Sequence, residues 1–169
     1  MWVKKANYAG GNRQGACGVS IGNTGYFMTG LKVDSDYCDV WGWNQTLNVW
    51  TKKDSFPGGV RMGAATASFH GYGYLSGGEH ASNCYLPFRG GVCGGVFYSD
   101  FWRYSADSDS WTKLTNFPGG GREFAVMVAD PLDTAIYYGT GNGSSFVYLS
   151  DWWMYKISTA TWTQLTDFP

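Results

Sequence analysis

Trp111-Thr-Lys-Leu-Thr-Asn-Phe-Pro-Gly-Gly-Gly-Arg122 is the clearest copy of a segment that occurs four times in the chain. The other copies begin at Trp2, Trp50 and Trp162. In each of the three longer copies an arginine lies 11 residues after the tryptophan. A spacing that recurs to the residue indicates one structural unit repeated along the chain.

Each copy has the pattern of a strand, a sharp turn and a second strand. Trp-Thr-Lys-Leu alternates large apolar with polar side chains, as a half-buried strand does. Pro-Gly-Gly then ends the strand, because proline lacks an amide donor and glycine accepts a positive φ. We therefore expect a new strand to begin at the arginine, which is Arg13, Arg61 or Arg122.

The remainder of each unit also repeats in a fixed order. An alanine follows the arginine after three residues, and then come a tyrosine, a glycine-rich stop and an Asp-x-Trp-x-aromatic motif. This order predicts four strands per unit, and no stretch between them has helical periodicity. We expect the tryptophan of the aspartate motif to be buried between units. The three motifs are Asp39-Val-Trp41-Gly-Trp43, Asp100-Phe-Trp102-Arg-Tyr104 and Asp151-Trp-Trp153-Met-Tyr155.

The length of the unit indicates the architecture. The tryptophans that open the copies are 48, 61 and 51 residues apart, and repeats of about this length with several strands are typical of propeller blades. The order of landmarks resembles the kelch repeat, especially its tandem form in secreted bacterial proteins. The resemblance covers the whole chain and implies an all-β propeller. The first blade departs most, with Thr29-Gly30 replacing the glycine pair and Tyr8-Ala9 replacing Phe-Pro.

The repeat predicts an all-β fold of three four-stranded antiparallel blades plus one extra outer strand. Propellers close with about four to eight blades, so three blades leave two open faces for further blades of the same polypeptide or for a second copy. A homodimer would leave a surplus outer strand in each chain, which favours half of a longer, six-bladed propeller. A homodimer remains the alternative if the first copy frays or swaps. The blades are expected at about 13–54, 61–115 and 122–167, and the extra strand at about 2–6.

Strand parity places the longer loops together. In a four-stranded antiparallel meander the chain reverses at every strand. The turn into the innermost strand and the loop between the second and third strands therefore emerge on the same face, which we call the long-loop rim. It comprises residues 7–12, 31–38, 54–60, 79–98, 116–121 and 142–149.

Residues 79–98 form an irregular loop. The chain takes 22 residues from the last glycine of the second strand to the repeat aspartate in the second blade, against 9 and 10 in the others. Loops that long are functional or disordered. A disulfide between Cys84 and Cys93 would close a small loop and indicate an oxidising compartment, outside the cell or at its surface; two free thiols are the alternative. Cys17 and Cys38 fall on strands that are not neighbours, so we expect them to be unpaired.

Composition argues against several partners. The net charge is −1 and the pI is about 6.0, whereas nucleic acid or an anionic membrane would favour a basic face. No apolar run approaches the roughly 20 residues of a membrane helix. Only 15% of the residues are charged and 18% are aromatic, which suits strand-only blades that need buried area. We therefore expect no nucleic-acid partner and no membrane insertion.

The pattern assigns no catalytic residue, metal ion or cofactor. An enzyme similar to galactose oxidase, the copper radical oxidase with kelch-type blades, would need two histidine ligands, but His70 and His80 fall on opposite rims. A glycosidase needs two carboxylates roughly 5–10 Å apart, and the only glutamates are Glu79 and Glu123. The repeat aspartates are expected to cap strand ends. An enzyme is therefore the less favoured interpretation.

The repeated arginines have two interpretations. In a closed ring Arg13, Arg61 and Arg122 would encircle the channel mouth, where their forked donors could bind carboxylate or sulfate. Alternatively, each one bonds neighbouring carbonyls and the repeat aspartate. Recurrence in every blade favours the second interpretation, because a ligand seldom contacts all blades alike.

Two functions follow from these patterns. The favoured one is a secreted binding or scaffolding module that contacts protein or glycan through the long-loop rim. The alternative is part of a propeller enzyme, galactose-oxidase-like or sugar-isomerising, whose catalytic residues lie in blades absent from this chain. Aromatic and arginine side chains dominate interface hot spots. The candidate contacts are Tyr85, Leu86, Phe88 and Arg89 in the irregular loop, with His80, Arg13, Arg61 and Arg122 beside them.

Overall fold

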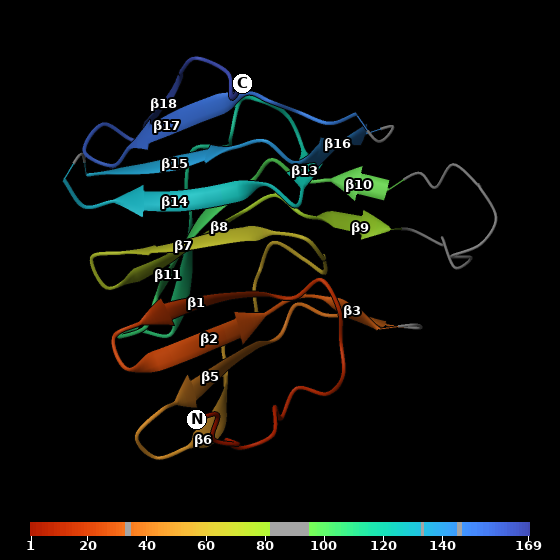
Figure 1. Ribbon diagram of the computed structural model, residues 1–169, viewed down its shortest axis with the longest axis vertical. Helices are drawn as coiled ribbons and strands as arrows, with labels where there is room; N and C mark the ends of the chain where they lie inside the picture. The colour runs from red at the N-terminus through yellow and green to blue at the C-terminus, as the bar shows by residue number, and fades with distance from the viewer. Residues whose placement is uncertain (33–34, 82–94, 133, 145–146) are drawn as a thin grey trace.

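The computed structural model describes residues 1–169 except 33–34, 82–94, 133 and 145–146. The described residues fold into strands and turns, and three four-stranded antiparallel sheets dominate the molecule (Figure 1). In this part of the chain no helix is long and apolar enough to cross a membrane. The predicted all-β fold class is confirmed.

Each large sheet is a meander whose strands follow one another in chain order, as the repeat predicts. Blade 1 contains β1 (Cys17–Ile21), β2 (Thr24–Met28), β5 (Val40–Asn44) and β6 (Val49–Lys53). Blade 2 contains β7 (Ala65–Phe69), β8 (Tyr72–Ser76), β11 (Phe101–Ser105) and β12 (Ser110–Lys113). Blade 3 contains β14 (Val126–Asp130), β15 (Ala135–Gly139), β17 (Trp152–Lys156) and β18 (Thr161–Gln164).

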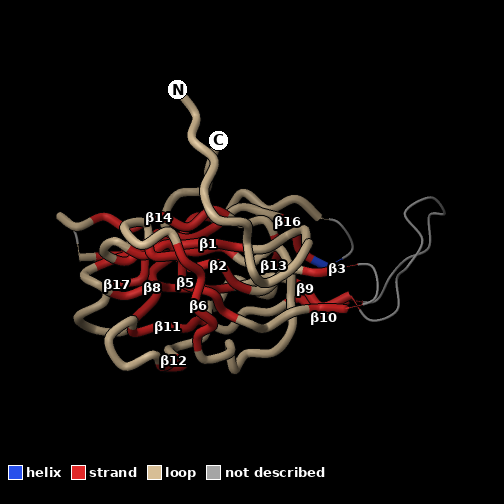
Figure 2. Tube along the Cα trace, turned by 90° about the horizontal axis from the view of Figure 1, so that it is seen from below, coloured by secondary structure: helices blue, strands red, loops and turns tan. Residues whose placement is uncertain are grey.

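Three two-stranded ribbons extend the blades at one end (Figures 1 and 2). All of their strands except β13 lie in loops that strand parity assigns to the long-loop rim, and the figures place the ribbons on the same side of the stack of blades. The ribbons are β3 (Leu31–Lys32) with β4 (Ser35–Asp36), β9 (Glu79–Ala81) with β10 (Gly95–Phe97), and β13 (Arg122–Glu123) with β16 (Asn142–Gly143).

The hydrophobic core lies between the blades. One cluster joins blade 1 to blade 2 and includes Tyr26, Val40 and Tyr104, and a second joins blade 2 to blade 3. The phenylalanine of each Phe-Pro-Gly-Gly turn enters these clusters. Phe56 is 1% exposed and Phe117 is 2% exposed. The turn between two units therefore supplies part of the packing that holds them together.

The repeat tryptophans are less buried than the sequence predicts. Trp41, Trp102 and Trp153 are each half-buried. Their indole nitrogens all donate to the repeat aspartate two residues earlier, over 2.7 Å. The expectation of burial between blades holds in part. Trp102 and Trp153 pack against the core clusters, but each repeat tryptophan also lies beside the repeat aspartate at the rim, while the phenylalanines fill more of the space between blades.

The expected outer strand at residues 2–6 does not form. Residues 1–8 have no strand structure. Ala6 N donates to Asn48 Oδ1 over 2.9 Å, and Trp50 Nε1 donates to Ala6 O over 3.3 Å. A strand exists through a ladder with a neighbour, and among the described residues no preceding blade offers this segment an edge.

Candidate functional site on the long-loop rim

Each blade carries the same buried ion pair at the rim. Arg61 Nη1 and Nη2 lie 2.6 and 2.9 Å from the two carboxylate oxygens of Asp100. Arg61 also donates to the carbonyls of Gly77, over 2.9 Å, and Gly58. The equivalent pairs are Arg13 with Asp39 and Arg122 with Asp151.

These contacts account for the repeated arginines. The side chains of Arg13, Arg61 and Arg122 are 1%, 0% and 0% exposed. The Arg61 guanidinium carbon also lies 3.8 Å from the ring centroid of Tyr98. The arginines thus bond the repeat aspartate and nearby carbonyls, and their burial leaves no collar of free guanidinium groups for a ligand.

The same contacts keep two of the aspartates ionised. Burial alone would raise the pKa of Asp39, but hydrogen bonds from Arg13 and Trp41 outweigh burial and leave that pKa below its usual value. The pKa of Asp151 is lowered in the same way, by Arg122 and Trp153 acting against burial. The repeat aspartates are thus structural partners rather than strand-end caps alone.

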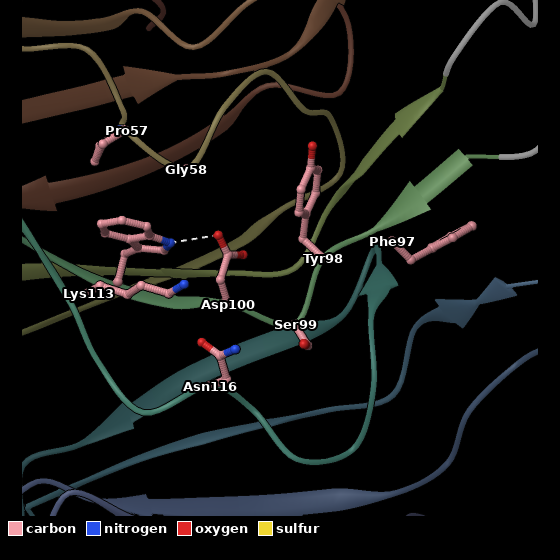
Figure 3. Close-up of a pocket in the computed structure, with 9 residues that line it drawn as sticks. Pro57, Gly58, Phe97, Tyr98, Ser99, Asp100, Lys113 and Asn116 are labelled. Atoms are coloured by element: carbon pink, nitrogen blue, oxygen red, sulfur yellow. Dashed lines mark hydrogen bonds between the residues drawn. The ribbon is translucent and has the colours of Figure 1, made fainter.

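A pocket of about 540 Å³ opens beside the Arg61–Asp100 pair (Figure 3). Its walls come from three segments of the chain at or next to the long-loop rim. Pro57 and Gly58 belong to the turn into blade 2, Tyr98 and Asp100 to the segment after β10, and Asn116 to the turn out of blade 2. The repeat pattern does not reveal this pocket, because its walls are up to 59 residues apart in the sequence and include ordinary repeat positions.

The pocket offers both aromatic and polar surface. Lys113 and Asn116 are exposed, and Figure 3 shows them with Asp100 around one opening. The Lys113 ammonium lies 5.7 Å from the ring centroid of Trp102. The Asp100 oxygens are already bonded to Arg61 and Trp102. The ammonium and the Asn116 amide are therefore the polar groups most accessible to a ligand.

A second polar cluster lies at the inner end of the same rim. Gly78 N donates to Arg122 O over 2.7 Å, which brings β9 beside β13. Each of those backbone partners is followed by a glutamate, Glu79 and Glu123. Asn142 pairs with Glu123 between β13 and β16, and its Nδ2 donates to Glu123 Oε1 over 3.4 Å.

Glu123 is a buried carboxyl group with a raised pKa. The residue is 5% exposed, and its Oε2 has no hydrogen-bond partner among the residues that the structure describes. Burial, followed by the negative charge of Glu79, raises its pKa to about 7, although the hydrogen bond from Asn142 acts in the opposite direction. The glutamates that sequence analysis found 44 residues apart thus form an interacting pair.

The remaining predicted site residues fall into two groups. His80 lies in β9 opposite Val96, and His70 stacks on Phe69 in the turn between β7 and β8. Cys17 and Cys38 are free thiols, as predicted. Within the described ranges no group of three or more His, Cys, Asp or Glu residues is placed to hold a metal ion. Outside those ranges lie Cys84, Tyr85, Leu86, Phe88, Arg89 and Cys93.

Comparison with known proteins supports the fold. No family model matches the chain, and no curated protein matches it. Among solved structures, the one titled "Structure of YjhT" superposes with a TM-score of 0.71 at 19% sequence identity. The match covers 93% of this chain and 52% of that one, so the chain spans about half the length of its structural neighbour. At this identity the likeness supports a propeller-like fold and nothing finer.

Proposed function

We propose that this chain is part of a secreted kelch-type propeller that binds a glycan through its long-loop rim. The observation that carries the proposal is the pocket beside Trp102, Lys113 and Asn116. Its walls come from three segments at or next to the rim, and small-ligand sites of this kind combine apolar surface with a few polar groups that fix orientation.

A glycan suits the groups that remain accessible. Sugar rings present apolar C–H faces, which pack on aromatic surface such as the exposed part of Trp102, and hydroxyls, which exchange hydrogen bonds. Asn116 can donate and accept such bonds, and the Lys113 ammonium can only donate. Because the Asp100 carboxylate is already bonded, the pocket favours ligands rich in oxygen acceptors over cationic ones.

Screening wild-type protein on an array of immobilised oligosaccharides tests the proposal. The hits are then measured by titration calorimetry with Lys113→Ala and Asn116→Ala. We expect Lys113→Ala to weaken binding at least about tenfold, since a hydrogen bond to a charged group contributes roughly 1.5–3 kcal/mol, and Asn116→Ala to weaken it about two- to tenfold, since a neutral hydrogen bond contributes roughly 0.5–1.5 kcal/mol. Lys156→Ala, which removes an exposed lysine of blade 3, is the matched control. An array without hits, or hits that both pocket variants retain, would contradict the assignment.

The glutamate pair favours a second candidate, a propeller enzyme acting on sugars. A carboxyl group with a pKa of about 7 can give or take a proton at neutral pH, and Glu123 has such a pKa. Other catalytic residues would then lie in blades beyond this chain. Following reducing monosaccharides by ¹H NMR with wild type and Glu123→Gln tests this candidate. It requires a reaction that the wild type accelerates and the variant does not.

A further inference from the structure

Blades 1 and 3 each present one apolar face that no described residue of another blade covers. The two faces lie at opposite ends of the stack, near the N- and C-terminal ends of the chain (Figure 1). On blade 1, Phe27 is 39% exposed. The residues at the same register position in the other blades, Leu75 and Tyr138, are 0% exposed.

Blade 3 shows the complementary pattern on its other side. Val126 is 49% exposed and Val128 is 46% exposed. Their register equivalents in blade 2, Ala65 and Ala67, are both 8% exposed because blade 3 covers them. The open face of blade 1 therefore corresponds to the side of blades 2 and 3 that packs on the preceding blade. The open face of blade 3 corresponds to the side of blades 1 and 2 that packs on the following blade.

Backbone hydrogen bonds repeat across that interface as well. Gly30 N of blade 1 donates to Arg61 O of blade 2, and Gly78 N of blade 2 donates to Arg122 O of blade 3, over 2.8 and 2.7 Å. Gly141 holds the same position in blade 3, and Arg13 O holds the acceptor position in blade 1. In the described part of the chain no blade follows Gly141 or precedes Arg13. Gly141 N and Arg13 O are therefore the donor and the acceptor that one more interface of the same kind would join.

We propose that a second copy of this chain covers both faces, so that two copies close a six-bladed ring. Blade 3 of each copy would pack on blade 1 of the other, and Gly141 N would donate to the partner subunit's Arg13 O. A head-to-tail interface closes into a ring when its rotation allows, and six blades lie within the usual range for propellers. This chain matches 52% of its structural neighbour, and two copies would give a body of about that neighbour's size.

The structure also removes the objection that a dimer would contain surplus outer strands. Residues 2–6 form no strand, so they require no sheet edge. Tyr8 already packs on Trp50 of the open face, with ring centroids 4.9 Å apart, just as Phe56 packs on Trp111 at 4.8 Å. Each new interface would therefore contain Tyr8 as its inserted aromatic ring.

Phe168, near the C-terminal end of the sequence, would compete with the partner subunit's Tyr8 for this position in the interface. Phe168 N donates to Ser150 O over 2.7 Å, as Phe117 N does to Ser99 O over 2.8 Å, but Phe168 is 63% exposed. The carbonyl of Gly10 is bonded to Arg13, which anchors the segment next to Tyr8. We therefore expect Tyr8 to stay in the interface and Phe168 to be displaced.

Light scattering coupled to size exclusion tests the proposal on the 169-residue chain. We expect a mass twice the 18.6 kDa of one chain at about 50 μM. Phe27→Asp and Val126→Asp, one on each open face, should each give a folded monomer by circular dichroism. Leu132→Asp, at a 91% exposed turn position, is the control and should leave the dimer intact.

Three results would overturn the proposal. These are a wild-type monomer at that concentration, a dimer that both face variants retain, and assembly into open-ended polymers. Two truncations test the aromatic insertion separately. Removing residues 168–169 should leave the dimer intact, whereas removing residues 1–8 should dissociate it, and the reverse result would assign the position to Phe168.

Discussion

At the residue scale, the arginine after each turn is the side chain on which the rim depends most. Arg61 is fully buried, and its charge is balanced by Asp100 and by carbonyl oxygens. A buried charge costs several kcal/mol to desolvate, so its partners determine whether it is tolerated. The repeated motif is thus a requirement of folding and leaves ligand contacts to other residues.

Removing that partner should be costly. Asp100→Ala leaves the Arg61 guanidinium buried beside carbonyls alone, and breaking a buried pair typically destabilises by about 3–5 kcal/mol. Urea unfolding followed by tryptophan fluorescence measures the loss. Asp107→Ala, at an exposed turn position, should change stability by less than about 0.5 kcal/mol. Equal effects of the two changes would contradict the structural role.

The stability contributed by Glu123 should depend on pH. Its pKa is raised from 4.5 to about 7 in the folded protein. Below pH 4.5 both states are protonated, so there is no penalty. Between pH 4.5 and about 7 the unfolded chain ionises first, and the folded state loses stability relative to it.

Glu123→Gln removes this titration. We expect the melting temperature of the variant, relative to wild type, to rise from pH 4.5 to about 7 and then to level off. Differential scanning fluorimetry across that range measures the difference, with Asp107→Asn as the control. A constant difference between pH 4 and 8 would show that Glu123 does not titrate in this window.

At the element scale, the Phe-Pro-Gly-Gly turn joins blades as well as strands. Phe117 is buried against Tyr138, Trp153 and Trp162, with ring centroids 4.7, 5.6 and 5.1 Å apart. Phe168 occupies the same position in the repeat but has no blade to pack on among the described residues. The same residue type therefore has different surroundings within one chain.

This contrast gives a matched pair of substitutions. Phe117→Ala should cost about 3–5 kcal/mol, the usual range for deleting a buried large aromatic side chain. Phe168→Ala removes a side chain that is 63% exposed and should cost less than about 0.5 kcal/mol. Chemical denaturation of both variants at low protein concentration measures the difference. Similar losses would mean that the packing between blades contributes little.

At the scale of the whole molecule, three stacked blades end in two apolar faces. Phe27, Val126 and Val128 are exposed on these faces, and large contiguous exposed apolar surfaces mark interaction sites. If two copies cover these faces, association stabilises the native state by mass action.

The melting temperature of the wild type should therefore rise with protein concentration. Calorimetric scans between about 1 and 100 μM measure this dependence. Phe27→Asp should melt at a temperature that does not vary over the same range. A wild-type melting temperature that is equally constant would argue against association.

Much of the architecture can be predicted from local patterns. The strand alternation, the Pro-Gly-Gly turns and the recurring Asp-x-Trp motif predict four strands per blade, and strand parity predicts a common rim. The structural role of Arg13, Arg61 and Arg122 also follows from their recurrence. Each of these features recurs in successive units of the chain. Each prediction therefore rests on several occurrences of the same pattern within one sequence.

The candidate sites depend on contacts between segments that no local pattern relates. Glu79 and Glu123 interact because a backbone bond joins successive blades, and the pocket beside Trp102 needs walls from three separate segments at or next to the rim. The Trp-Val-Lys-Lys segment at residues 2–5 has the pattern of a strand, but strand formation requires a hydrogen-bonded neighbour that only packing supplies. Pattern sets what a segment favours, whereas burial and pairing between blades determine which of those preferences are realised.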